Sequence, residues 1–293
     1  KRNAENDRRY AEKQIELLRN KTTGSNNQLS EFYPYRYLAA EGFLPGYGFT
    51  KLPVRLFVPS DGGEYISRPK FIALREFGPH NTIYHSGGKY KVNQMLWSEM
   101  DNPMVSAKIS TASGYILIGA DTQRNVCPVT GADLTENANR KVISDMIEIR
   151  ESRADVNDRI TCEEEERQIL GYDITTAFYL QSGLNNIEEI LVKVDGEIFL
   201  RMQYLPAARI VLINNKWRVS KEGDGFLMGK KTGFWKRPAQ LENRTQNAEE
   251  VQRIKLYAEN TADALYIQPT KNLNLHPFDA GVTTLMYAIK RGF

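Results

Sequence analysis

The sequence of 293 residues has few of the residues that build disulfides, metal centres or membrane spans. Two cysteines, Cys127 and Cys162, are too few for a disulfide framework or a four-cysteine zinc site, which is typical of a cytoplasmic protein. The only histidines, His80, His85 and His276, lack the i, i+4 spacing of paired metal ligands, so we interpret them as structural and expect no metal. No apolar run approaches the roughly 20 residues of a membrane span, and no apolar signal segment begins the chain, so we expect no membrane contact.

Charge is balanced overall, at a formal net value of +3, but it is distributed unevenly along the chain. Residues 141–200 contain six Lys and Arg against fourteen Asp and Glu, whereas residues 201–293 contain fifteen against eight. An acidic middle followed by a basic end indicates either an internal electrostatic contact or a face that binds a polyanion. Ordinary solvated surface on both segments is the alternative interpretation.

Closely spaced turn signals predict an α+β fold dominated by antiparallel β-hairpins, arranged as a curved sheet or sandwich with a few short helices. Strands are expected at 54–58, 82–92 and 115–120, and two short ones within 253–269. Tight turns are expected at Gly87-Gly88, Asp195-Gly196, Asn214-Asn215 and Lys230–Gly233.

The domain organisation follows from the change in composition near residue 30. Residues 1–30 read as a connecting helix and linker from an upstream domain, and residues 31–293 as one module. Within it, residues 120–160 read as an insertion resembling a degenerate zinc knuckle. Cys127 begins the turn-rich sequence CPVTG, in which Val129 and Thr130 stand where a second cysteine would be needed.

Catalytic motifs are absent from the sequence. The segment GDGFLMGKKTG fails the phosphate-loop pattern because Asp224 stands five residues before Gly229, where glycine is required. The acidic run Glu163–Glu166 reads as a solvated charge cluster. We therefore predict no catalytic residue and no cofactor in this chain; a hidden hydrolase or nuclease, using that run beside His80 or His85, is a minor alternative.

Basic and aromatic residues gather late in the chain, a combination that suits single-stranded nucleic acid because cations contact phosphates and aromatic rings stack on bases. Alternation along strands would instead bury Trp217 and Trp235 in the core beneath a basic exterior, and both readings stay open. The predicted nucleic-acid-binding residues are Lys216, Arg218, Lys221, Lys230, Lys231, Lys236 and Arg237.

An aromatic and glycine-rich segment, YRYLAAEGFLPGYGF, suggests an interdomain hinge. Glycine permits tight turns, proline stiffens the path, and buried aromatic rings would anchor it. An aromatic core loop is the alternative interpretation. The predicted hinge residues are Tyr35, Tyr37, Pro45, Gly46 and Tyr47.

Four sequence blocks carry a resemblance to a known family. They are YRYLAAEGFLPGYGFTKLPVRLFVP, RPKFIALREFGPHNTIYHSGGKYKV, RITCEEEERQILGYDITTAFYL and INNKW…GDGFLMGKKTGFWK, spanning about residues 32–290. In this order they resemble the carboxyl-terminal region of large bacterial DEAD/DEAH-type helicases of superfamily two. The likeness is greatest to DISARM antiphage helicases (the DrmA family), with Druantia-type and MrfA-like repair helicases as relatives.

The resemblance implies a non-catalytic module of an ATP-dependent DNA translocase in phage defence. Its partners would be DNA, the upstream motor domains and a partner defence subunit, and ATP and Mg²⁺ would bind the motor rather than this chain. The family often has a four-cysteine zinc element between the blocks that match 82–118 and 159–172, where this chain retains only Cys127. A protein-docking scaffold without DNA contact, or a repair-helicase accessory domain, are the alternatives.

Overall fold

The structure is a computed structural model that describes residues 53–60, 63–97, 103–159, 171–180, 187–221, 223–238, 250–270 and 280–292. The chain divides into two compact units. The first comprises residues 1–178 and 210–260, and the second comprises residues 179–209 and 261–293. The predicted connecting helix, the aromatic hinge, Glu163–Glu166, Cys162 and His276 all lie outside the described residues.

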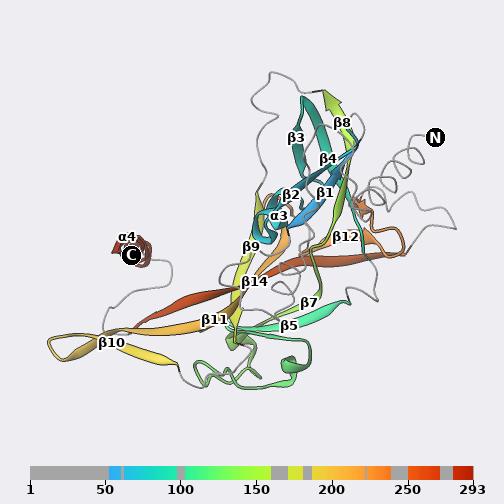
Figure 1. Cartoon of the computed structure of the whole chain (residues 1–293). Helices are drawn as coiled ribbons and strands as arrows, with labels where there is room; N and C mark the ends of the chain where they lie inside the picture. The colour runs from blue at the N-terminus through green and yellow to red at the C-terminus, as the bar shows by residue number, and fades with distance from the viewer. Residues whose placement is uncertain are drawn as a thin grey trace. The chain divides into compact units, whose positions relative to one another are not determined.

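A five-stranded sheet in the order β2-β1-β8-β4-β3 forms one part of the first unit (Figure 1). β1 pairs with β2 and β4 with β3 as antiparallel hairpins, and β8 joins the two hairpins by running antiparallel to β4 and parallel to β1. The inner faces bury the apolar residues of the alternating sequence, so that Leu56, Val58 and Val92 are fully covered. The strands are β1 (Val54–Val58), β2 (Glu64–Arg68), β3 (Thr82–His85), β4 (Gly88–Met95) and β8 (Ser152–Arg159).

A second sheet has the order β10-β11-β14-β7-β5-β6. In addition, β9 pairs with β11, and β12 pairs with both β13 and β14. β14 runs parallel to β7, and both β6 and β7 run antiparallel to β5. Its strands include β5 (Val105–Ser110), β6 (Ile116–Ile118), β7 (Arg140–Glu148), β9 (Tyr172–Tyr179), β10 (Glu188–Val194), β11 (Glu197–Trp217), β12 (Phe226–Gly229), β13 (Trp235–Lys236) and β14 (Val251–Pro269).

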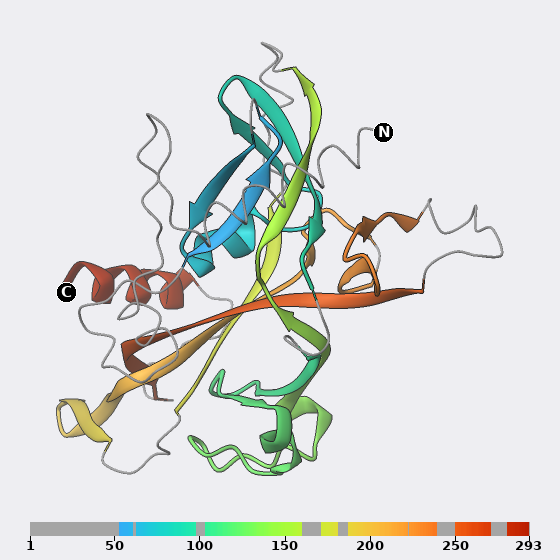
Figure 2. The same ribbon diagram turned by 45° about the vertical axis from the view of Figure 1, so that its right-hand side comes forward.

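Helices are few in the described chain. α3 (Lys70–Glu76) lies at one end of the five-stranded sheet and buries Ala73 and Leu74 (Figure 1). α4 (Ala280–Gly292) belongs to the second unit and has no fully buried residue. Two short 3₁₀ turns, η1 (Gly119–Gln123) and η2 (Asn137–Asn139), lie between β6 and β7 (Figure 2). None of the described helices is long and apolar enough to cross a membrane.

The predicted fold class, α+β with mainly antiparallel strands in curved sheets, is confirmed. The sequence did not indicate the two parallel pairings, β1 with β8 and β14 with β7, because their partners lie far apart in the chain. The turn at Asp195-Gly196 is confirmed, with φ of 50° and 85°. The hairpin of β3 and β4 turns at Ser86-Gly87, one residue earlier than the predicted Gly87-Gly88, since Ser86 and Gly87 have the positive φ values.

The predicted turn at Asn214-Asn215 is wrong. β11 continues through both residues, and both are completely buried. The Asn214 side-chain amide donates to the carbonyl of Leu74 at 3.1 Å, so the asparagine links a strand to α3 instead of turning the chain. Two short strands were likewise expected within 253–269, where the single strand β14 runs without interruption.

Candidate nucleic-acid interface

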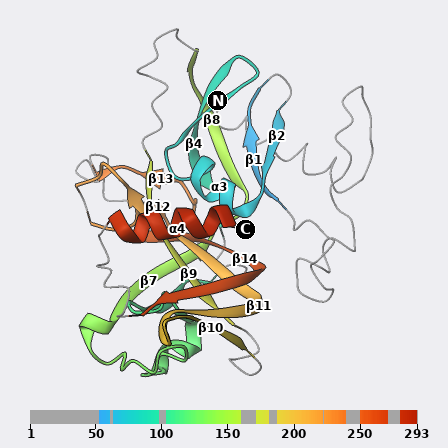
Figure 3. The same cartoon turned by 90° about the vertical axis from the view of Figure 1, so that its left-hand side faces the viewer.

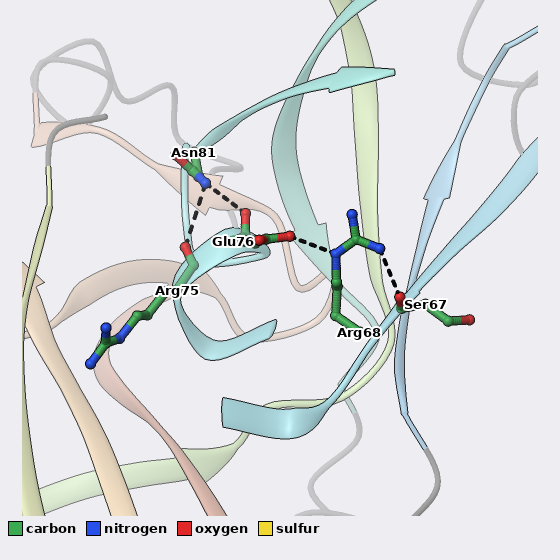
Figure 4. Close-up of polar contacts among 5 residues, drawn as sticks. All are labelled: Ser67, Arg68, Arg75, Glu76 and Asn81. Atoms are coloured by element: carbon green, nitrogen blue, oxygen red, sulfur yellow. Dashed lines mark hydrogen bonds and ion pairs between the residues drawn. The ribbon is translucent and has the colours of Figure 1, made fainter. Parts of the chain in front are cut away.

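The loop after α3 is held in place by its polar neighbours (Figure 4). The side-chain amide of Asn81 donates to the carbonyls of Glu76, at 2.7 Å, and Arg75, at 3.4 Å, which satisfies the free carbonyls of the helix end. The Glu76 carboxylate accepts from Nε of Arg68 at 2.8 Å, and Nη1 of Arg68 donates to the carbonyl of Ser67 at 3.0 Å. The loop is therefore bonded to the end of α3, and that end of the helix is in turn bonded to β2.

Backbone hydrogen bonds tie the same loop to β4. The amide of His80 donates to the carbonyl of Val92 at 3.0 Å, and the amide of Val92 donates to the carbonyl of Asn81 at 2.9 Å. His80 adopts a φ of 61°, in the left-handed region that only a minority of non-glycine residues occupy. Its imidazole is thereby held at a fixed place beside the strand.

Aromatic packing supports the loop from beneath. The buried Tyr172 donates its hydroxyl to the carbonyl of Pro79 at 2.9 Å. A Cβ atom on Gly78 would lie 2.6 Å from that hydroxyl, so the close approach requires glycine. The Tyr172 ring stacks on Trp217, with centroids 4.3 Å apart, and meets the edge of Phe226. Burial raises the pKa of Tyr172 well above its ordinary value, so this phenol stays neutral and is a structural group.

The hairpin of β12 and β13 docks against the end of β4. Its turn is closed by hydrogen bonds between Gly229 and Phe234 and between Gly233 and Gly229, each at 2.9 Å. The amide of Met95 donates to the carbonyl of Gly233 at 3.0 Å, and the side chain of Gln94 reaches the carbonyl of Thr232 at 2.6 Å. A Cβ on Gly233, whose φ is 69°, would lie 2.1 Å from the carbonyl oxygen of Met95, so glycine is required at the contact.

This docking brings Lys236 and Arg237 to the loop that contains His80. Nε2 of His80 lies 3.5 Å from the carbonyl of Lys236. Burial lowers the pKa of His80 to about 4; the Lys236 carbonyl opposes this change, while the charges of Arg237 and Lys91 add to it. Burial and the charge of Arg237 also lower the pKa of Lys91. We call His80, Lys91, Lys236 and Arg237 the basic cluster.

The basic cluster joins residues from three separate stretches of the sequence, two of which supply positive charge. Lys91 lies on β4, His80 on the loop between α3 and β3, and Lys236 and Arg237 at the end of β13. Arg237 is exposed, and Nζ of Lys236 lies over the ring of Phe234, 5.8 Å from its centroid. Because the charge of Arg237 lowers the pKa of Lys91, an anion placed beside these two residues would be electrostatically favoured.

Two of the other predicted cations have acidic partners. Nζ of Lys216 lies 3.2 Å from a carboxylate oxygen of Asp224, and Nζ of Lys230 lies 2.6 Å from one of Glu250. Their charge is partly neutralised, so they contribute less to an anion-binding field. These two ion pairs also hold the β12 hairpin to its neighbours.

The remaining three predicted cations are exposed. Arg218 donates to the carbonyl of Tyr172 at 3.4 Å and packs against Gly171, which places it at the end of β9. Lys221 follows β11 and Lys231 lies in the turn between β12 and β13. Of the seven predicted cations, the structure therefore brings Lys236 and Arg237 into the basic cluster and adds His80 and Lys91.

The tryptophans are packed against the core. Trp235 is buried and meets the edge of Phe226, with centroids 6.4 Å apart, and Trp217 is half-buried against Tyr172. Of the two readings left open, burial beneath a basic exterior is therefore the observed one. These rings are occupied by protein contacts and are not free platforms for base stacking.

Sequence reasoning missed Lys91 and interpreted His80 as structural. Lys91 sits among alternating polar residues on a hairpin, a pattern that carries no binding signal. Its proximity to Arg237 is created by the pairing of Gln94 with Phe234, nearly 140 positions apart in the sequence. Among the described residues, no group of three or more His, Cys, Asp and Glu side chains is placed to hold a metal ion, and His85 instead contacts Glu64 at 2.6 Å.

No protein-family model matches the chain, and no curated protein or solved structure is significantly similar to it. The likeness to helicase carboxyl-terminal regions therefore rests on the four sequence blocks alone.

Proposed function

We propose that this chain is a non-catalytic module of an ATP-dependent DNA helicase or translocase in bacterial antiphage defence, and that it contacts the DNA backbone through the basic cluster. Four sequence blocks motivate the helicase assignment. The observation that supports DNA contact is the proximity of Lys91 and Arg237, whose charges both lower the pKa of His80, with Lys236 next to Arg237 in the chain. In this proposal ATP and Mg²⁺ bind the upstream motor domains, and the module works in the cytoplasm with a partner subunit.

Phosphate is the ligand that the basic cluster suits best. Lysine and arginine side chains from two segments, β4 and the end of β13, can contact successive phosphates, and no base-reading geometry is needed for such contacts. The tryptophans are engaged in the core, so binding would depend mainly on charge. We therefore expect weak sequence preference and strong dependence on salt.

The test compares the wild-type chain with the double variant Lys91→Gln, Arg237→Gln in binding a fluorescent poly-dT oligonucleotide at several salt concentrations. Loss of two phosphate contacts on a single strand should reduce the slope of log K against log salt by about 1.4. The matched control is Lys230→Gln, because Lys230 is already paired with Glu250. It should change affinity less than the single variants Lys91→Gln and Arg237→Gln, which are measured beside the double variant.

An unchanged affinity and salt slope in the double variant would reject DNA contact at this surface. Equal losses in Lys230→Gln and in the cluster variants would show that net charge alone governs binding. Thermal unfolding of each variant, measured in parallel, separates loss of binding from loss of fold. The helicase assignment has its own test, since the coding sequence upstream should encode motor domains with a phosphate-binding loop.

A second candidate function, docking of a partner protein, is favoured by the ribbon of β10 and the adjoining part of β11 (Figure 3). Ile190 and Val194 lie on one face of β10 and are 59% and 50% exposed. Apolar side chains gathered on an exposed strand are typical of an interaction surface. In the helicase proposal, its occupants would be the motor domains or the partner subunit.

Aspartate at Ile190 and Val194 should weaken co-elution of the chain with those subunits by at least tenfold in apparent affinity, while DNA binding stays unchanged. Val219→Asp is the control, because Val219 is 62% exposed and lies in the other unit. Retained co-elution of the Ile190 and Val194 variant would contradict docking through this ribbon. Loss of co-elution together with a wild-type chain that binds no DNA would favour the pure scaffold.

A further inference from the structure

Two turns of the first unit share one backbone geometry. The first spans Ser110–Tyr115, and the second, Cys127–Ala132, lies seventeen positions later. The amide of Ser110 donates to the carbonyl of Tyr115, and that of Cys127 to the carbonyl of Ala132, both at 2.9 Å. Each turn is thus closed at its base by the same hydrogen bond.

The inner bonds of the two turns match as well. Gly114 donates its amide to the carbonyl of Ser110 at 2.8 Å, and Gly131 donates to that of Cys127 at 2.9 Å. Both glycines adopt the left-handed backbone conformation, with φ of 72° at Gly114 and 68° at Gly131. Next in the chain, the amide of Tyr115 donates to the Ser113 hydroxyl at 3.1 Å, and that of Ala132 donates to the Thr130 hydroxyl at 3.4 Å.

The side chains of the two turns converge. Oγ of Ser113 lies 3.2 Å from Sγ of Cys127, and both residues are buried. Burial alone raises the pKa of Cys127, but the neighbouring hydroxyls of Ser113, Thr130 and Ser110 favour the thiolate, outweigh burial and bring the pKa to about 7. Oγ of Ser110 is also buried and helps to lower the pKa of this thiol, but its geometry does not form a hydrogen bond.

The spacing of these four residues is that of a zinc site. Ser110 and Ser113 are separated by two residues, as are Cys127 and Thr130, and a glycine follows each pair. Two C-x₂-C turns that converge in this way hold tetrahedral Zn²⁺ when all four side chains are thiolates. Here one thiol meets three neutral hydroxyls, and this donor set does not fit Zn²⁺, which prefers thiolate, imidazole or carboxylate ligands.

We infer that Ser110, Ser113, Cys127 and Thr130 form a metal-free counterpart of a two-turn zinc site, in which hydrogen bonds between hydroxyls and a thiol hold together what a metal ion would otherwise join. The first turn connects β5 to β6, and the second lies between η1 and η2 in the chain. The flanking pairs support the geometry, because β5 and β6 pair before and after the first turn and Val126 bridges Asp133 around the second.

The test restores the missing thiols. The variant Ser110→Cys, Ser113→Cys, Thr130→Cys, prepared under reducing conditions, should bind one Co²⁺ per chain with the visible absorption bands of tetrahedral thiolate coordination. Added Zn²⁺ should remove those bands. The wild-type chain should show no such bands, and a chelator should leave its unfolding midpoint unchanged.

A folded triple variant without tetrahedral Co²⁺ bands would overturn the inference, because the four positions would then not converge. Stoichiometric Zn²⁺ binding by the wild-type chain would also overturn it, since the hydroxyls would then serve as ligands. Two single variants extend the test in case the triple variant does not fold. Cys127→Ala should lower the unfolding midpoint by at least about 3 °C, and Cys127→Ser, which can keep the hydrogen bonds, should lower it less. Equal effects would contradict the hydrogen-bonded cluster.

Discussion

His80 shows how a single residue acquires its properties from neighbours that are distant in the sequence. Its left-handed backbone is fixed by β4, its ring faces the carbonyl of Lys236, and its ordinary pKa is lost through burial and through two nearby cations. The imidazole is therefore neutral at physiological pH. It packs at the centre of the basic cluster without adding to its charge.

The lowered pKa of His80 makes the stability of the fold depend on pH. Below pH 6.5 the unfolded chain gains a proton at this residue, whereas the folded protein does not until about pH 4. Above pH 6.5 this residue costs the folded protein no stability. As the pH falls from 6.5 toward 4, protonation of the unfolded chain lowers the free energy of unfolding. Partial exposure limits the effect to no more than about 3 kcal/mol.

Denaturant unfolding of wild type and His80→Asn at several pH values between 7 and 4 measures this contribution. Asparagine tolerates the left-handed backbone and does not titrate. The variant should therefore lose less stability than the wild type over this range. Parallel curves for the two proteins would show that His80 is not responsible.

At the scale of elements, β11 illustrates how tertiary contacts override a local signal. A pair of asparagines is a strong turn signature, yet Asn214 and Asn215 are completely buried in a strand of 21 residues. Each finds a partner, Leu74 for Asn214 and the hydroxyl of Thr175 for Asn215. These bonds satisfy the side-chain NH₂ donors, which could otherwise bond to the local backbone in a turn, while both Oδ1 atoms are buried without a hydrogen-bond partner.

The bond between Asn214 and Leu74 is expected to contribute measurably to stability. Asn214→Ala removes it and leaves a buried carbonyl of α3 without this donor, so the free energy of unfolding should fall by about 1–3 kcal/mol. Asn125→Ala is the control, because Asn125 is exposed and its carbonyl rather than its side chain makes the hydrogen bond to Leu134. The control should stay within about 0.5 kcal/mol of wild type.

At the scale of the whole molecule, the two units differ in how much apolar surface they bury. The largest core cluster, which includes Leu56, Val92, Ile147 and Leu256, lies within the first unit. In the second unit, β10 exposes Ile190, Leu191 and Val194. Strands with few buried contacts open at lower free energy than strands in a core.

Hydrogen exchange followed by mass spectrometry should separate the units. Amides of β10 are expected to exchange earlier than those of β4 and β8, which pair within the covered five-stranded sheet. Equal protection throughout would indicate that both units unfold as one cooperative body. Slower exchange in β10 after addition of a motor or partner subunit would agree with docking on the ribbon.

Local sequence patterns determined much of the fold: the strand at VRLFV, the turn at Asp195-Gly196 and the Lys230–Gly233 turn all form as expected. These features depend on residues close in the chain, whose backbone preferences are readable directly. The sequence also placed Lys236 and Arg237 in a basic region. It could not place Lys91 beside Arg237, because no local rule relates residues so far apart.

The turn-rich knuckle at Cys127 was likewise readable from its proline, glycine and cysteine, but its match to Ser110–Tyr115 was not. Serine at two-residue spacing carries no metal signal, so only superposable hydrogen bonds reveal the relation. Turn type and strand alternation are properties of neighbouring residues, and the sequence by itself determined them. Which cations cluster, which asparagines are buried and which hydroxyls meet the thiol depend on long-range strand pairing, and only the tertiary structure decided them.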